Sequence, residues 1–182
     1  NIFGLTNTIK QNEKTPYNPN SIYALAKTTA IHACEMYNRI YNTHACGAIF
    51  YNHESPRRTT DYVSRKITSS LAKILAGKQN KIKLGDISAE IDWGYAKDYM
   101  YAAWNILQLD DADDFIIASG QVSSVEKFVE IAFSMVNLNY KEYIEIDQSL
   151  IRPSKTTALI GDISKAEKIF NFKNSYDLEG LI

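Results

Sequence analysis

The run Ala45-Cys46-Gly47-Ala48-Ile49-Phe50-Tyr51 consists of small and apolar residues without interruption, and the polar run Asn52-His53-Glu54-Ser55-Pro56-Arg57-Arg58 follows it directly. An apolar run of this length is typical of a strand that is buried on both faces of a parallel sheet. Open α/β sheets bind their ligands just beyond the carboxyl ends of such strands. The two runs together therefore predict a parallel α/β sheet with a ligand site at residues 52–58.

Helical and extended segments alternate on both sides of this strand, which predicts an α/β fold. Residues 5–20 are polar and turn-rich and are expected to form a loop, and residues 85–94 an irregular acidic turn. The capping box Ser123-Ser124-Val125-Glu126 is expected to open a helix. The other expected helices lie at about 21–42, 63–75 and 96–109, with two small helices at the end of the chain, and the other expected strands at 82–84, 114–119 and 143–146.

Tyr23 and Lys27 are four residues apart near the start of the first expected helix, so their side chains share one face of it. A lysine ammonium group at this distance stabilises the phenolate of the tyrosine, which makes the pair a candidate proton shuttle. An apolar stripe runs beside the pair at helical intervals, and its members are Ile22, Ala26, Ala30, Ala33, Tyr37 and Ile40. The spacing alone is weak evidence, because long helices often carry an unrelated tyrosine and lysine in this way.

The composition limits the classes of protein to which the chain can belong. The 182 residues have room for one domain, or one and a part, and 45% hydrophobic with 23% charged residues is ordinary for a globular chain. A net charge of -1 without a basic run predicts no nucleic-acid partner and no anionic membrane partner. The two cysteines have neither metal-ligand nor disulfide-framework spacing, and no apolar run approaches the roughly 20 residues that span a bilayer. We therefore expect a cytoplasmic location and no metal site.

Three segments together resemble one family. They are the Tyr23/Lys27 pair, the run at 52–58 and Asp92-Trp93-Gly94-Tyr95-Ala96-Lys97-Asp98-Tyr99. All seven residues of the 52–58 run match the motif of the GDP-mannose 4,6-dehydratase family, and Val63-Ser64-Arg65-Lys66-Ile67 is close to the family's Val-Thr-Arg-Lys-Ile. The chain therefore resembles these nucleotide-sugar enzymes of the extended short-chain dehydrogenase/reductase type, and the resemblance covers nearly its whole length.

The resemblance implies the carboxyl-terminal part of a Rossmann-type parallel sheet plus a smaller mixed α/β substrate-binding lobe. Residues 1–54 would be the remainder of the dinucleotide-binding domain. Residues 55–182 would be mainly the nucleotide-sugar-binding lobe, with about 92–119 returning to the dinucleotide-binding domain. None of the eight glycines forms a Gly-x-Gly-x-x-Gly loop, so we expect the phosphate loop upstream and expect these 182 residues to be inactive alone.

The family's reaction implies roles for several residues. In this reaction GDP-mannose loses water to give GDP-4-keto-6-deoxymannose, and NADP takes a hydride from C4 and returns it at C6. Tyr23 would be the catalytic base at the C4 hydroxyl, and Lys27 would hold the nicotinamide ribose, so both would also bind the cofactor. His53 and Arg58 match positions that contact the cofactor, and Asn52 is assigned to both the cofactor and the substrate.

Two cations match positions at the nucleotide sugar. Lys66 and Arg152 would stabilise the substrate diphosphate through charge-assisted hydrogen bonds. The family also suggests a homo-oligomer, either a dimer or a tetramer.

The chain departs from the family pattern at three positions. Asn1 stands where the family has the glutamate that takes the C5 proton, and an amide cannot accept a proton at neutral pH. Ile91 replaces an arginine, and Lys155 replaces an acid. Two alternatives therefore stay open beside the dehydratase: a nucleotide-sugar epimerase or reductase on the same scaffold, and a catalytically impaired nucleotide-sugar binder.

Overall fold

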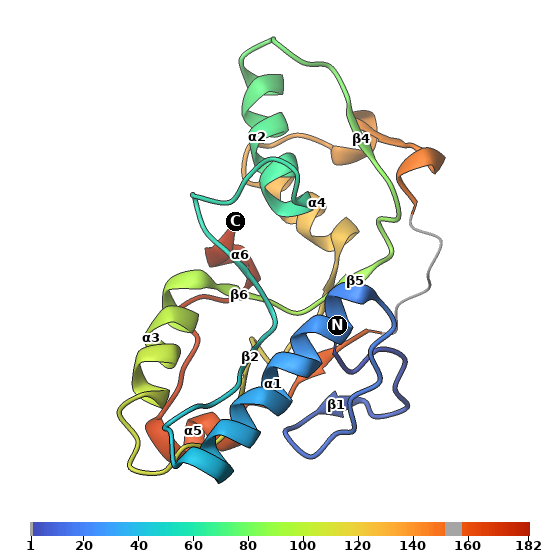
Figure 1. Cartoon of the computed structure of the whole chain (residues 1–182). Coiled ribbons are helices and arrows are strands. Elements are labelled where there is room, and N and C mark those ends of the chain that lie inside the picture. The colour runs from blue at the N-terminus through green and yellow to red at the C-terminus, as the bar shows by residue number, and fades with distance from the viewer. Residues whose placement is uncertain (1, 152–157) are drawn as a thin grey trace.

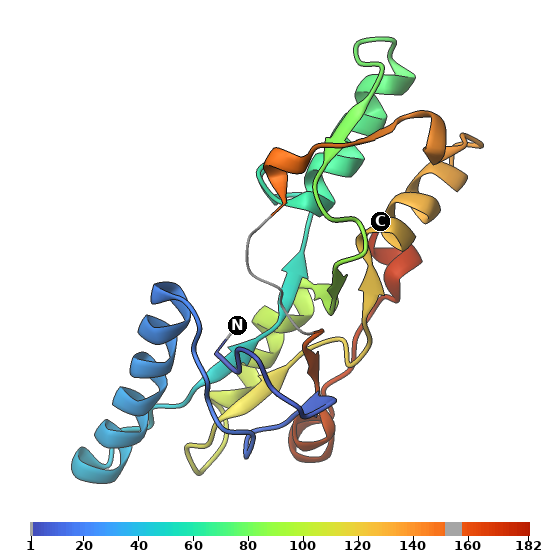
Figure 2. The same ribbon diagram turned by 90° about the vertical axis from the view of Figure 1, so that its right-hand side faces the viewer.

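The computed structural model describes residues 2–151 and 158–182 and shows two lobes stacked one above the other (Figures 1 and 2). The lower lobe holds α1, α3 and α5, and the upper lobe holds α2 and α4 with α6 beside them. The helices run α1 Ile22–Tyr41, α2 Val63–Leu75, α3 Ala96–Ile106, α4 Val125–Ser134, α5 Ser164–Phe170 and α6 Leu178–Leu181. The predicted α/β fold is confirmed, and each expected helix is present within a few residues of its predicted bounds.

Among the described residues, the strands form five two-stranded pairs, of which four are parallel. The parallel pairs are β1 (Lys10–Gln11) with β10 (Ile160–Gly161), β2 (Ala48–Phe50) with β7 (Phe115–Ile117), β3 (Asn52–Glu54) with β6 (Trp93–Tyr95), and β4 (Ile82–Leu84) with β9 (Ile144–Ile146). The antiparallel pair is β5 (Glu90–Ile91) with β8 (Ser123–Ser124). Every parallel partner is far away in the sequence, as crossover connections require.

The lower lobe is built on both faces of the β2–β7 pair. Phe115 and Ile117 of β7 pack on the side of α3 and α5, whereas Ile116 packs with Ile49 of β2 on the opposite side. This alternation follows from the two-residue period of a strand. The strand pair is therefore sandwiched between two apolar layers, as predicted for a parallel sheet.

The upper lobe has its own apolar core between α2, α4 and the inward side chains of β4. Ile67 of α2, Phe133 of α4 and Ile82 of β4 are all fully buried in it. Trp93 joins the same cluster from β6, with its ring 5.1 Å from that of Phe128. The tryptophan therefore links the upper lobe to the strand that leads into α3.

Helix α1 begins and ends where its sequence predicts. The Ser21 hydroxyl accepts a hydrogen bond from the backbone N–H of Ala24 at 3.1 Å, and Asn42 closes the helix in the left-handed conformation. The helix turns only a narrow face to the sheet, on which Ala24 and Thr28 are buried. The apolar stripe lies on the exposed side instead, and its members Ile22, Ala26, Ala30, Ala33, Tyr37 and Ile40 are all exposed.

Several expected loops are strands in the structure. Residues 10–11 within the expected loop pair with β10, and residues 90–91 and 93–95 within the expected acidic turn pair with β8 and β3. The polar residues 52–54 extend the predicted buried strand as β3. The capping box is shifted by one residue, because Ser124, not Ser123, accepts the hydrogen bond from the backbone of Lys127. Each of these differences between the predicted and the observed elements arises because the residues pair with segments that are distant in the sequence.

Candidate active site

Tyr23 and Lys27 lie next to each other at the amino-terminal end of α1. The Lys27 Nζ is 5.5 Å from the centre of the Tyr23 ring, so the four-residue spacing places the ammonium group beside the phenol as expected. The Tyr23 side chain is 65% exposed. This end of α1 and strand β3 both lie at the level where the two lobes meet (Figures 1 and 2). The Tyr23 phenol is therefore accessible to a ligand.

His53 is held by its neighbours within the 52–58 run. Its Nδ1 lies 2.8 Å from the carbonyl oxygen of Tyr51, and because a carbonyl can only accept, Nδ1 carries the proton in the neutral ring. The ring also packs against Tyr99 at 5.0 Å and Phe50 at 5.6 Å. These contacts fix the orientation of the ring and leave Nε2 as its free acceptor in the neutral state.

Arg58 is fixed by a buried carboxylate. Its Nε lies 3.2 Å from Oε2 of Glu54, and its guanidinium carbon lies 3.4 Å from the centre of the Tyr62 ring. Glu54 is 7% exposed, and the Ser64 hydroxyl donates a hydrogen bond of 2.6 Å to it from α2. Glu54 thus joins the 52–58 run to the start of α2 and pairs with Arg58 by charge, although the buried Arg58 Nε makes no hydrogen bond to a described residue.

Two of the predicted substrate residues lie on different elements. Asn52 is exposed on β3, whereas Lys66 is half-buried on α2. Arg152 lies outside the described residues, as do Asn1 and Lys155. Ile91, which replaces the family's arginine, is half-buried on β5 and packs against the upper core.

A second buried carboxylate ties three segments together beneath the junction of the lobes. Asp92 is 1% exposed and accepts hydrogen bonds from the backbone of Ser119 at 2.7 Å, Gly120 at 3.1 Å and Gly161 at 3.2 Å. The Ser119 hydroxyl donates a further hydrogen bond of 2.6 Å. Burial raises the pKa of Asp92 above its ordinary value, and these hydrogen bonds oppose that shift. Asp92 therefore organises the carboxyl end of β7 and the β10 strand.

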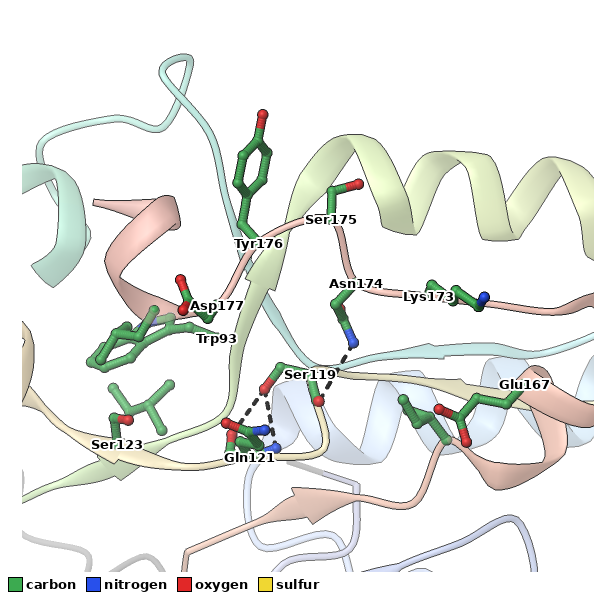
Figure 3. A pocket seen from close by; sticks show the side chains of 13 residues that line it. Trp93, Ser119, Gln121, Ser123, Glu167, Lys173, Asn174, Ser175, Tyr176 and Asp177 are labelled. Atoms are coloured by element: carbon green, nitrogen blue, oxygen red, sulfur yellow. Dashed lines mark hydrogen bonds between the residues drawn. The ribbon is translucent and has the colours of Figure 1, made fainter.

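A cavity with a volume of about 710 Å³ lies between the segment 173–178 and the residues that follow β7. Figure 3 shows Ser119, Gln121 and Asn174 next to one another in its lining. The Asn174 amide donates to the carbonyl oxygen of Ala118 at 3.1 Å. As far as the described residues outline this cavity, neither Tyr23 nor Lys27 lines it.

The second cavity, which we call the lysine cavity, has a volume of about 410 Å³ and lies between α2 and β4. Its lining residues are all polar and comprise Thr60, Lys66, Ser69, Ser70, Lys73, Gln79, Lys81 and Lys83. Lys66 is the one sequence-predicted site residue in this lining. The structure therefore brings Lys66 together with three lysines that the sequence analysis did not single out.

Over residues 2–151 and 158–182, no helix is both long and apolar enough to cross a membrane. Within the same residues, no group of three or more His, Cys, Asp or Glu side chains is placed to hold a metal ion.

Solved structures with the same fold are nucleotide-sugar and related enzymes. The fold matches that of RMD from Pseudomonas aeruginosa complexed with NADPH, with a TM-score of 0.89 and 18% identity over 99% of this chain and 60% of that one. It also matches dTDP-glucose 4,6-dehydratase (rfbB) from Bacillus anthracis str. Ames in complex with NAD, with a TM-score of 0.85 and 20% identity over 99% of this chain and 56% of that one. The chain therefore shares the Rossmann-type α/β fold of just over half of each of these structures.

Sequence comparison narrows this class to one family. The family model GDP-mannose 4,6 dehydratase matches residues 1–182. GDP-mannose 4,6 dehydratase 2 of Arabidopsis thaliana is 41% identical over 94% of this chain and 46% of its own length, and the Homo sapiens GDP-mannose 4,6 dehydratase is 36% identical over 100% of this chain and 53% of its own length. The chain belongs to the GDP-mannose 4,6-dehydratase family, as the 52–58 run predicted, and it spans about half the length of these curated relatives.

Sequence reasoning missed some polar groups that the structure places around the predicted residues. Ser64 binds Glu54 across ten positions, and nothing local indicates that contact. The lysines of the second cavity did leave a signal. Lys66 and Lys73 are seven residues apart on a helix. Lys81 lies just before β4 and Lys83 within it, two residues apart in extended backbone, so each pair shares one face.

Proposed function

We propose that this chain is the carboxyl-terminal part of an NADP-dependent GDP-mannose 4,6-dehydratase, a lyase that makes GDP-4-keto-6-deoxymannose. The observation that carries the proposal is the family match over the whole chain, together with a phenol and an ammonium group that lie side by side at the junction of the lobes. The relatives named above carry this activity in their names.

A nicotinamide cofactor is supported by the solved structures of like fold, which contain NADPH or NAD. We propose NADP because the resemblance to the family implies it and because the RMD structure of like fold contains NADPH. The donors and acceptors in the candidate site suit its ribose and phosphate groups: the exposed Tyr23/Lys27 pair, the free Nε2 of His53 and the guanidinium group of Arg58. The chemistry that NADP supplies when bound is acceptance of the C4 hydride and its return at C6.

The protein's own residues bind the substrate and move protons. The Tyr23 phenolate accepts the proton of the C4 hydroxyl, and the neighbouring Lys27 ammonium stabilises the negative charge on the phenolate. Lys66, Arg152 and Asn52 bind the GDP-sugar. Glu54 keeps Arg58 oriented toward the cofactor throughout. The division into a dinucleotide-binding part (1–54, with 92–119) and a nucleotide-sugar-binding part (55–182) belongs to the same proposal.

We also propose a cytoplasmic homo-oligomer that binds neither membrane nor nucleic acid. The exposed stripe of α1 supports the assembly, because Ile22 and Ile40 lie on one side of the helix and are 84% and 56% exposed. Apolar positions at intervals of three and four residues are typical of a helix that packs against another helix. A second copy of the chain would bury this stripe.

The deciding experiment follows the mass of the product. Native full-length protein is incubated with NADP and GDP-mannose, and the products are separated by liquid chromatography and weighed. Loss of one water from the nucleotide sugar supports the dehydratase. No product, with retained binding of GDP-mannose, would contradict it and leave a nucleotide-sugar binder.

The identity of Asn1 favours one alternative enzyme, an epimerase or reductase of the same superfamily. These reactions need Tyr23 and Lys27 for hydride transfer but not the glutamate whose place Asn1 takes. The same assay separates epimerisation from dehydration, because an epimer has the mass of its substrate. A reductase is tested separately with NADPH and a keto nucleotide sugar, because reduction would raise the mass of that substrate.

A further inference from the structure

The lysine cavity concentrates positive charge in a chain whose net charge is -1. Four lysines line it, and the described lining contains no carboxylate. Its volume of about 410 Å³ is within the range of roughly 300–1,000 Å³ that small-molecule sites occupy. A concave surface of one sign collects ligands of the opposite sign.

The fold assembles this cavity from two elements. Lys66 and Lys73 project from one side of α2, next to the buried face that carries Ile67. Lys81 and Lys83 flank the buried Ile82, so the strand period turns both away from the core. The apolar contact between α2 and β4 therefore holds four ammonium groups around one space.

The nearby acidic groups neutralise only part of this charge. Lys83 pairs with Glu145 at 3.7 Å, and both side chains are more than half exposed, so the pair is weak. The Asp147 carboxylate accepts hydrogen bonds from Ser149, whose hydroxyl is 2.6 Å away, and these lower the pKa of Asp147 more than Lys83 and Lys66 do.

Lys81 donates to a backbone carbonyl, that of Glu142, at 2.6 Å. Within the described part of the chain, Lys66 and Lys73 make no ion pair. Within the described residues, three of the four lining lysines therefore make no ion pair with a carboxylate, and the fourth, Lys83, makes a weak one.

We propose that the lysine cavity binds a phosphate-bearing anion, with Lys73 and Lys83 as ligands in addition to Lys66. Ammonium groups bind phosphate as compact charges, and the hydroxyls of Ser69 and Ser70 add neutral donors on the α2 side. The anion is either the diphosphate of a nucleotide sugar or a separate small phosphate compound. Both have the same chemistry at this surface.

Calorimetric titration of the full-length protein with sodium pyrophosphate tests the proposal without any catalytic step. The variant Lys73→Gln/Lys83→Gln removes two cations and leaves Lys66 in place. Lys14→Gln/Lys168→Gln is its matched control, because both lysines are exposed and neither lines either cavity. We expect the first variant to bind pyrophosphate at least about tenfold more weakly and the control to bind like the unaltered chain.

Added sodium chloride should weaken binding to the unaltered chain, because the ligands are partly exposed. Absence of saturable binding to the unaltered chain would overturn the proposal, and so would equal losses in the two variants. Circular dichroism checks that both variants are folded.

A parallel titration with GDP-mannose identifies the source of the phosphate. If the lysine variant also binds GDP-mannose more weakly and pyrophosphate competes with it, the cavity holds the diphosphate of the nucleotide sugar. If pyrophosphate still binds while GDP-mannose is bound, the cavity holds a separate anion. Failure of the proposed dehydratase reaction would leave pyrophosphate binding intact, so the two proposals can fail independently.

Discussion

At the scale of single residues, the candidate chemistry depends on the Tyr23 hydroxyl. The Lys27 ammonium lies beside the ring, and the Tyr23 side chain is exposed. In full-length protein we expect Tyr23→Phe to lower kcat by at least about 100-fold, because the proton acceptor is lost. GDP-mannose affinity, measured by calorimetry, should stay nearly unchanged.

Tyr41→Phe is the matched control for this change. Tyr41 is similarly exposed at the other end of the same helix and contacts Tyr37 instead of a cation. A Tyr23→Phe enzyme that turned over at the normal rate would remove Tyr23 from the mechanism.

The Glu54 carboxylate predicts a stability effect. Replacing it in Glu54→Gln removes the charge that faces Arg58 and turns one acceptor into a donor opposite the Ser64 hydroxyl. We expect the free energy of unfolding to fall by about 1–3 kcal/mol, measured by urea denaturation.

Glu145→Gln is the comparison, because Glu145 pairs with Lys83 on the surface at 3.7 Å. Its effect should stay below about 1 kcal/mol. Equal effects of the two substitutions would show that the buried pair adds nothing beyond a surface one.

At the scale of elements, β6 and α3 approach each other unusually closely. A Cβ at Gly94 would overlap the Tyr99 ring, which is fully buried and turns its hydroxyl into the contact without a hydrogen-bond partner among the described residues. We expect Gly94→Ala to lower the free energy of unfolding by about 1–3 kcal/mol through overpacking, as measured by urea denaturation.

A second substitution tests that cause. In a Tyr99→Leu background the ring is absent, so Gly94→Ala should cost clearly less than it does in the unaltered chain. An equal cost in both backgrounds would assign the effect to the strand backbone instead of the contact.

The elements also show why some predictions were wrong. Helices were predictable within a few residues, since their contacts repeat every three or four positions along the sequence. Residues 52–54 and 93–95 were expected outside strands because they are polar or glycine-containing. They become β3 and β6 because the fold places their backbones side by side, and backbone pairing does not depend on apolar side chains.

At the scale of the whole molecule, the exposed stripe of α1 predicts self-association. Ile40→Glu places a charge within the stripe, so we expect it to shift the full-length protein to monomers in light scattering coupled to size-exclusion chromatography. Gln148→Glu adds the same charge on the upper lobe and should leave the assembly intact. An unchanged mass for Ile40→Glu would place the interface elsewhere.

The sequence alone determined the α/β class, the helices, the Tyr23/Lys27 pair and, through the 52–58 run, the family. Each of these depends on residues within a few positions of one another or on a contiguous motif. Only the tertiary structure decided that Glu54 holds Arg58 with help from Ser64, that Asp92 collects donors from β7 and β10, and that Lys66 shares a cavity with lysines of β4. These contacts join segments up to 69 positions apart, and their geometry exists only after the apolar cores have closed.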